Sequence, residues 1–158
     1  MSVNSVFLLA VGIGIVAGLR AMTAPAAVSW AARLGWLNPH DSLLSFMGSA
    51  VAVAIFSLGA IVEYVTDKLP KTPSRTAPPG LIARILMGGL SGACLCASAG
   101  QSLIAGALLG GIGSLIGAFG GYQARTRLTR SLKVKDIYIA VLEDLVAIGF
   151  AFFLVSRG

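Results

Sequence analysis

The most constraining feature of the sequence is a run of forty residues, from Ile85 to Ala124, that contains no charged side chain. A soluble domain needs polar or charged residues on the outward face of each element, and this run supplies almost none. A single helix of this length would be about 60 Å long, twice the roughly 30 Å thickness of the hydrocarbon core of a bilayer. The run therefore predicts two membrane spans joined by a tight turn, which we place at the small and polar residues 98–102.

The composition supports the same class of protein. Hydrophobic residues make up 56% of the 158-residue chain and charged residues 11%, with a mean hydropathy of +0.88. Soluble domains carry about 25% charged residues. The net charge of +6 does not indicate nucleic-acid binding, because the basic residues lie in short connections between apolar runs. We predict one transmembrane domain over residues 1–158, with the lipid bilayer as its partner.

Five apolar segments follow one another, each close to the length that a helix needs to cross the hydrocarbon. They cover residues 3–26, 43–64, 83–97, 103–122 and 137–155. This pattern predicts an all-α, polytopic helical bundle of about five spans. Arg20 and Pro25 interrupt the first segment, so we expect a break after Gly18, and residues 23–35 are either a continued span or an interfacial helix.

Basic residues predict how the bundle is oriented in the membrane. Nine of the twelve lie in two connections, after the second and the fourth segments. They are Lys68, Lys71, Arg75, Arg84, Arg125, Arg127, Arg130, Lys133 and Lys135. The positive-inside rule places these connections in the cytoplasm, so we expect a cytoplasmic N-terminus and an external C-terminus. We expect Lys68, Lys71, Arg75 and Arg84 to contact anionic lipid headgroups or another anion.

Small residues at four-residue spacing predict close helix packing. Gly14 and Gly18 share one face of the first segment, and Gly113, Gly117 and Gly121 share one face of the fourth. Such faces let helix backbones approach closely, either within one chain or between copies in a homo-oligomer or a larger membrane complex. The similar spacing of Gly14–Gly18 and Gly88–Gly92 also suggests a weak parallel internal repeat.

Ionisable residues within the apolar segments are the candidates for a functional site. They are Arg20, Glu63, Asp67, Glu143 and Asp144. A charge in the hydrocarbon costs at least about 2.5–3.5 kcal/mol, so each is expected to face a partner or water. Either they form a polar site that binds a proton, a cation or a polar solute, or they pair with bases and hold the helices together. We expect Glu63 to be at least partly buried and paired.

The sequence contains no recognisable catalytic or phosphate-binding motif, so we expect no enzyme activity, no cofactor and no metal site. Cys94 and Cys96 fall inside a predicted span and are interpreted as small apolar residues. The single histidine, His40, and its neighbour Asp41 are interpreted as part of an external loop.

Three stretches resemble one known family. They are the segment from Glu63 to Thr76, with its Glu-x-x-x-Asp-Lys-x-Pro core, Gly18-Leu-Arg20-Ala near the N-terminus, and Leu142-Glu143-Asp144 near the C-terminus. Together they are similar to the bacterial membrane family named domain of unknown function 4126. The resemblance implies a small multi-pass protein of a bacterial inner membrane. It draws attention to the ionisable residues named above, including Lys68 and Arg75, but it implies no substrate.

The sequence is compatible with two functions. The first is a small transporter or channel-like protein for a polar or ionic solute, in which Glu63 and Glu143 handle a proton or cation and Arg20 contacts an anionic group or stabilises the helix break. The second is a structural or accessory membrane subunit that transports nothing, in which the same charges only pair with one another.

Overall fold

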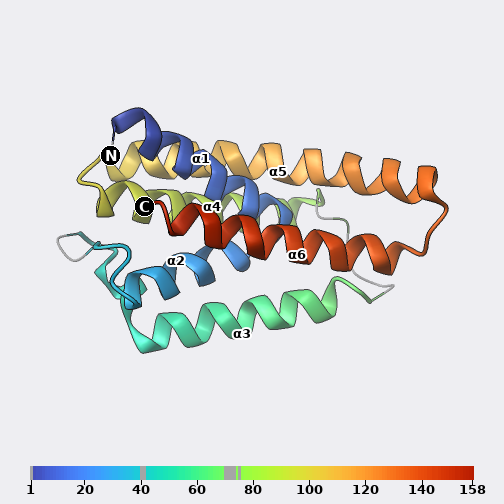
Figure 1. The fold of residues 1–158 in the computed structure, drawn as a ribbon, viewed down its shortest axis with the longest axis horizontal. Coiled ribbons are helices and arrows are strands. Elements are labelled where there is room, and N and C mark those ends of the chain that lie inside the picture. Colours follow the sequence, from blue (N-terminus) through green and yellow to red (C-terminus); the bar gives the residue numbers. More distant parts are fainter. Residues whose placement is uncertain (1, 40–41, 70–73, 75) are drawn as a thin grey trace.

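The computed structural model describes residues 2–39, 42–69, 74 and 76–158, and over these residues the chain is all-α, as predicted. The elements are α1 (Val3–Leu19), α2 (Thr23–Arg33), the short 3-10 helix η1 (Ser45–Gly48), α3 (Ala50–Thr66), α4 (Pro78–Ser98), α5 (Leu103–Leu132) and α6 (Asp136–Val155). Figure 1 shows the long helices lying roughly side by side in one bundle.

Local sequence signals account for where the helices begin and end. The hydroxyls of Ser2, Ser49 and Ser102 accept hydrogen bonds from backbone N–H groups in the first turns of α1, α3 and α5. Proline occupies the first positions of α4, where no N–H is needed. The turn between α4 and α5 contains Gly100 at φ +66°, a left-handed conformation that glycine adopts without steric cost.

The first predicted span does not cross the bundle. α1 ends at Leu19, Arg20 is extended (φ −141°, ψ 107°), and α2 begins at Thr23. Figure 1 shows α1 running from the N-terminus to the middle of the bundle and α2 returning toward the same end. The two helices therefore form a hairpin, and residues 3–26 are not one continuous helix: the break that we expected after Gly18 lies at Arg20.

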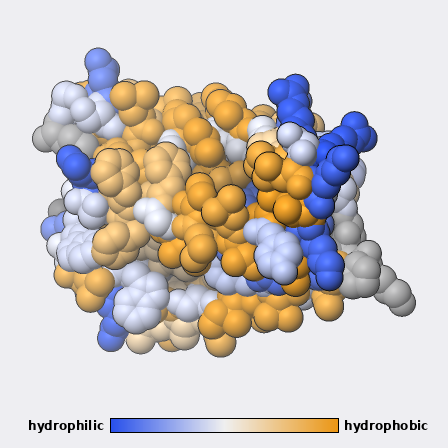
Figure 2. All heavy atoms as spheres, turned by 45° about the vertical axis from the view of Figure 1, so that its right-hand side comes forward, coloured by the Kyte–Doolittle hydropathy of each residue, from blue (hydrophilic) through white to orange (hydrophobic). Residues whose placement is uncertain are grey.

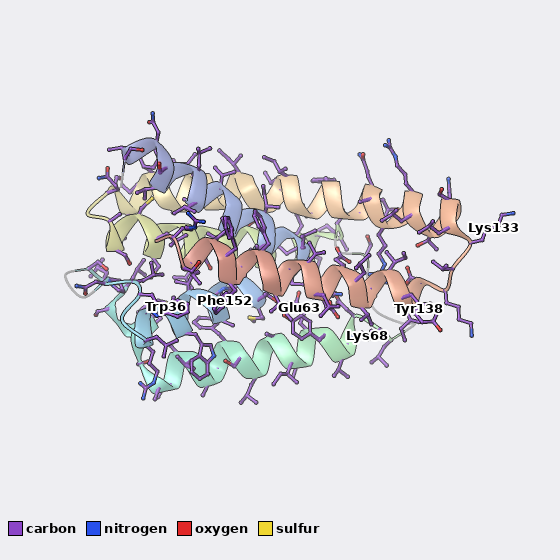
Figure 3. All side chains as sticks on the ribbon, viewed as in Figure 1. Trp36, Glu63, Lys68, Lys133, Tyr138 and Phe152 are labelled. Atoms are coloured by element: carbon purple, nitrogen blue, oxygen red, sulfur yellow. The ribbon has the colours of Figure 1, made fainter. Side chains whose placement is uncertain are left out.

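Both chain termini consequently lie at the same end of the bundle (Figure 1). Val6 and Ala10 of α1 pack on Cys96, near the end of α4, and Gly158 lies against Leu95. We call this end, which also holds the 98–102 turn, the terminal end. The opposite end, which holds Lys133, is called the basic end (Figure 3). An N-terminus and a C-terminus on opposite sides, as the sequence suggested, do not agree with this arrangement.

α5 packs most extensively on α1 and α4, at a backbone separation that only glycine permits. A Cβ atom on Gly14 would lie 2.1 Å from the Gly110 carbonyl oxygen, and one on Gly18 would lie 2.3 Å from the Ser114 carbonyl oxygen. Gly113 and Gly117 face backbone atoms of α1 equally closely, whereas Gly121 is half-buried. The glycine face of α5 is thus occupied within the chain.

α1 and α4 run in opposite directions, because the start of α4 meets the end of α1 and the end of α4 meets the start of α1. The expected parallel repeat, which required both glycine pairs to point the same way, is therefore wrong.

Helix lengths also differ from the predicted segments. α5 continues ten residues beyond the expected end at 122, so much of the basic connection is helical. Residues 43–49 lie outside α3, and α4 begins five residues before the predicted segment. By length and composition α4, α5 and α6 can cross a membrane, whereas α1 and α3 have 17 residues each.

The surface agrees with the apolar helices. Figure 2 shows a broad hydrophobic surface across the middle of the molecule, with hydrophilic side chains gathered toward its two sides. Large apolar side chains such as Leu108, Leu145 and Phe152 are exposed. These features indicate a membrane protein.

Candidate polar site at the helix break

The carboxylate of Glu63, on α3, caps the start of α2. Its two oxygens accept hydrogen bonds from the backbone N–H groups of Ala21 and Met22, each at 2.8 Å. These N–H groups have no partner within the helix, and the helix dipole favours a negative charge at this position. Glu63 is thus mostly buried, with 12% of its side chain exposed, and stabilises the point at which the chain reverses.

Arg84, near the start of α4, contacts the other side of the same break. Its Nη1 atom donates to the carbonyl oxygens of Gly18 and Leu19 at 3.4 and 3.3 Å, and lies 3.6 Å from the Glu63 carboxylate. A cation is favourable at the C-terminal end of α1, where the carbonyl groups lack partners. One acid and one base from distant parts of the chain therefore complete both ends of the interrupted helix.

Arg20, the residue at the break itself, is fully buried. It forms ion pairs with Asp67, directly after α3, and with Asp144 of α6, and its guanidinium lies 5.9 Å from the centre of the Tyr64 ring. Lys68 also pairs with Asp144, at 3.0 Å. Through these contacts the break is connected to both α3 and α6.

A second group of charges lies closer to the basic end. Arg125 of α5 forms a two-pronged ion pair with Asp136 at the start of α6, and its Nη1 atom is 3.9 Å from Glu143. Five of the six acidic residues of the chain therefore take part in one of the two groups.

Between the two groups is a cavity of about 800 Å³, which we call the vestibule. Its charged lining residues are Asp67, Lys68, Arg84, Arg125, Arg130 and Asp136, and Ser74, Tyr122, Thr126 and Thr129 add hydroxyl groups. Arg20 and Glu63 are not among the lining residues, although their partners Asp67 and Arg84 are. The side chains of Asp67 and Arg84 therefore lie between the cavity and the helix break, and the cavity does not reach the break itself.

The residues that the sequence analysis selected as candidates for the site differ in their contacts and exposure. Arg20, Asp67 and Asp144 meet directly, and Glu63 meets Arg84. Glu143 lies in the Arg125 group instead. Lys68 is partly exposed, whereas Arg84 is buried and faces the break. Lys71 and Arg75 lie outside the described residues.

Sequence reasoning missed Asp136, Tyr64 and Thr23 as members of the site. The Tyr64 and Thr23 hydroxyls are 2.6 Å apart and join α2 to α3 beside Arg20. Tyr64 was available as a signal, since it directly follows Glu63 in the segment that carries the family resemblance. The backbone N–H groups of residues 21 and 22 leave no signature in a sequence.

No set of three His, Cys, Asp or Glu side chains able to hold a metal ion occurs in the part of the chain that the structure describes. What the arrangement offers instead is fixed positive and negative charge, hydroxyl groups and space for a small molecule.

The apolar helices, the interrupted first helix and the buried charges together indicate a helical membrane protein with a polar site at its middle. The sequence profile of the family described as Domain of unknown function (DUF4126) matches residues 7–156, and the chain belongs to this family. No curated protein and no solved structure matches the chain significantly.

Proposed function

We propose that the protein is a membrane transporter for a small solute that carries an anionic group. The observation that carries the proposal is the position of the helix break, which lies in contact with a charge cluster at the foot of the vestibule. By the charge cluster we mean Arg20, Glu63, Asp67, Lys68, Arg84 and Asp144. Interrupted helices whose ends face a polar site near the middle of the membrane are a recurring feature of transporters, because their free N–H and C=O groups can bind solutes and ions.

The choice of an anionic solute follows from the lining of the vestibule. Four cations, Lys68, Arg84, Arg125 and Arg130, line it together with two acids, Asp67 and Asp136. Arginine binds carboxylates and phosphates with paired hydrogen bonds, and the nearby hydroxyl groups can complete the coordination. An arriving anion would compete with Asp136 for Arg125 and with Asp144 for Lys68, both of which are partly exposed.

The proposed orientation places the bundle axis along the membrane normal and the basic end in the cytoplasm, in accordance with the positive-inside rule. Both termini are then external, and the vestibule opens to the cytoplasm. α1 and α2 form a hairpin that enters from the external side and turns at the charge cluster.

The burial of Arg20 favours a second candidate, a structural or accessory subunit. A fully buried guanidinium held by two carboxylates serves equally well to fix α1, α3 and α6 relative to one another. In that case the vestibule is only a hydrated surface recess, and no solute passes.

Transport by reconstituted protein separates the two candidates. Purified protein in sealed proteoliposomes is offered a panel of carboxylates, inorganic phosphate, sulfate and zwitterionic amino acids, and uptake is measured with labelled solute. We expect uptake of at least one anion, reduced at least about tenfold by Lys68→Gln. The exposed Arg127 does not line the vestibule, so Arg127→Gln is the matched control and should transport normally.

Absence of flux for every solute, from protein with a normal thermal unfolding transition, would overturn the transport proposal and support the accessory role. Flux that Lys68→Gln leaves unchanged would show that the solute does not use the vestibule.

A further inference from the structure

One face of α5 supplies most of the polar groups that a solute in the vestibule would meet. The lining residues on this helix are Tyr122, Arg125, Thr126, Thr129 and Arg130. Their spacing of three and four residues places them on one side of the helix over successive turns, a length of about 12 Å. A small solute can therefore contact several of them at once.

The two threonine hydroxyls on this face are fixed as hydrogen-bond acceptors. Thr126 donates its hydroxyl proton to the Tyr122 carbonyl oxygen at 2.9 Å. Thr129 donates in the same way to the Arg125 carbonyl oxygen at 2.8 Å. Since a carbonyl oxygen only accepts, each hydroxyl gives its single proton to the backbone and presents only lone pairs to a ligand. These two oxygens suit an N–H donor and offer nothing to an anion.

Arg130 is the cation on this face that is available to an anionic group. Among the residues that the structure describes, no acidic side chain forms an ion pair with Arg130, and its side chain is exposed. Arg130 follows Thr126 by four residues, so the two side chains are neighbours on the helix surface, with Cβ atoms about 6 Å apart. A cation and an acceptor thus lie within reach of one small molecule.

The ion pairs of the vestibule favour a solute that carries charges of both signs. Arg125 is paired with Asp136, and both side chains line the cavity. An anion that takes the place of Asp136 on Arg125 leaves this carboxylate without its cation, and that loss opposes binding. A solute with an ammonium group in addition gives both side chains a new partner.

We infer that the solute is a zwitterion, with a primary ammonium group joined by a short chain to a carboxylate, phosphate or sulfonate. Its anionic group binds Arg125 and Arg130. Its ammonium group donates to Thr126, Thr129 and Asp136, which matches three N–H donors with three acceptors. This inference rests on the proposed transport function, which it narrows from solutes with an anionic group to solutes with both charges.

Pairs of solutes that differ only in the ammonium group test the inference. They are β-alanine and propionate, phosphoethanolamine and ethyl phosphate, and taurine and ethanesulfonate. Binding to the full-length protein in detergent is measured from the rise in Tm with solute concentration, and uptake is measured in sealed proteoliposomes. In at least one pair we expect the zwitterion to bind at least about tenfold more tightly, as expected for one charge-assisted hydrogen bond.

Two kinds of variant separate the two ends of the solute. Thr126→Val combined with Thr129→Val keeps the shape of both side chains but removes the acceptors, so the preference should fall below about threefold. Thr66→Val is the matched control, because Thr66 is exposed and also donates to a backbone carbonyl but does not line the vestibule. Arg130→Gln should weaken both members of a pair alike, whereas Arg127→Gln, outside the vestibule, should weaken neither.

Equal binding of the two members of every pair would overturn the inference, and uptake of both would show that anion transport stands without it. A preference that the double valine variant leaves unchanged would also overturn it, because the ammonium group would then bind elsewhere. Preferential binding of a zwitterion without any uptake would support the site and count against transport. Binding of no member of any pair would overturn the inference, and the wider panel of solutes would then decide the transport proposal separately.

Discussion

Replacing Glu63 by Gln tests whether a carboxylate holds the helix break together. The glutamine side chain has the same shape, but it has one acceptor oxygen where Glu63 has two, and its NH₂ group would face the N–H of Ala21 or Met22. One charge-assisted hydrogen bond, worth about 1.5–3 kcal/mol, is lost, and Arg84 loses its nearby anion. We expect a total destabilisation of about 2–4 kcal/mol.

Thermal unfolding in detergent, followed by tryptophan fluorescence, measures this loss. Trp30 is a suitable reporter because its hydrogen bond to Ser57 joins α2 to α3 and breaks when the hairpin leaves α3. For a chain of this size the expected fall in Tm is about 4–16 °C. Asp136→Asn is the control, since that carboxylate is 57% exposed and exposed ion pairs contribute at most about 1 kcal/mol.

A fall in Tm for Glu63→Gln no larger than that for Asp136→Asn would contradict the role assigned to this carboxylate. Glu63 would then be a hydrated helix end, and its contacts with the break would have no energetic weight. A double-mutant cycle with Arg84→Gln adds a second measure. The two losses should be clearly non-additive, because both side chains stabilise the same reversal of the chain.

Three further perturbations follow from the packing and the charges. Gly14→Ala should destabilise the protein by about 1–3 kcal/mol or more, because the new Cβ would overlap the Gly110 carbonyl group. A Cβ at Gly120 would meet nothing within 4 Å, so Gly120→Ala is the control and should be tolerated in the same unfolding assay. Combining Asp67→Asn with Asp144→Asn leaves the buried Arg20 without an anionic partner and should lower the free energy of unfolding by about 3–5 kcal/mol. Changing Arg20 to Met as well should restore much of this stability, and no recovery would contradict the ion-pair assignment. Cysteines introduced at Ser2 and Ser156 should react with an impermeant thiol reagent from one side of a sealed vesicle, and a cysteine introduced at Lys133 should react from the other side. The buried Cys94 and Cys96 should not react. Labelling of positions 2 and 133 from the same side would refute the hairpin.

The helices that are defined by uninterrupted apolar runs could be predicted from the sequence. The charge-free stretch from Ile85 to Ala124 divides at the expected turn, and α6 begins within one residue of its predicted position. Helix ends set by other signals were less accurate. The apolar pattern predicts that α5 ends at residue 122, but residues 123–132 contain no Pro or Gly. The helix continues to Leu132 and is ended by Lys133, which adopts φ +49°.

The reversal between α1 and α2 could not be predicted, although the break itself was expected after Gly18. An apolar run of about 24 residues is long enough to span a bilayer, and hydropathy carries no information on whether a chain continues or turns back after an interruption. The direction depends on partners 42 and 65 positions away, Glu63 and Arg84, which complete the two helix ends only in the folded chain. The pairing of Arg20 with Asp67 and Asp144 is hidden for the same reason.

The charge cluster explains why an arginine occupies the break. A residue at this position must leave the helical conformation in the middle of an apolar bundle, where polar side chains are tolerated only with partners. Arg20 contacts two carboxylates at once, Asp67 directly after α3 and Asp144 on α6, so it joins the hairpin to two segments that each contribute to the lining of the vestibule.

Asp144 links the buried part of the charge cluster to the vestibule, because it pairs both with the fully buried Arg20 and with the partly exposed Lys68. On the proposed function, an anion that binds Lys68 would compete with Asp144 for that cation and so alter the balance of charge around Arg20. Solute binding at the vestibule and the packing of the α1–α2 hairpin would then be thermodynamically linked. Any solute that is transported should therefore also raise the Tm at which the protein unfolds, because it binds the folded state.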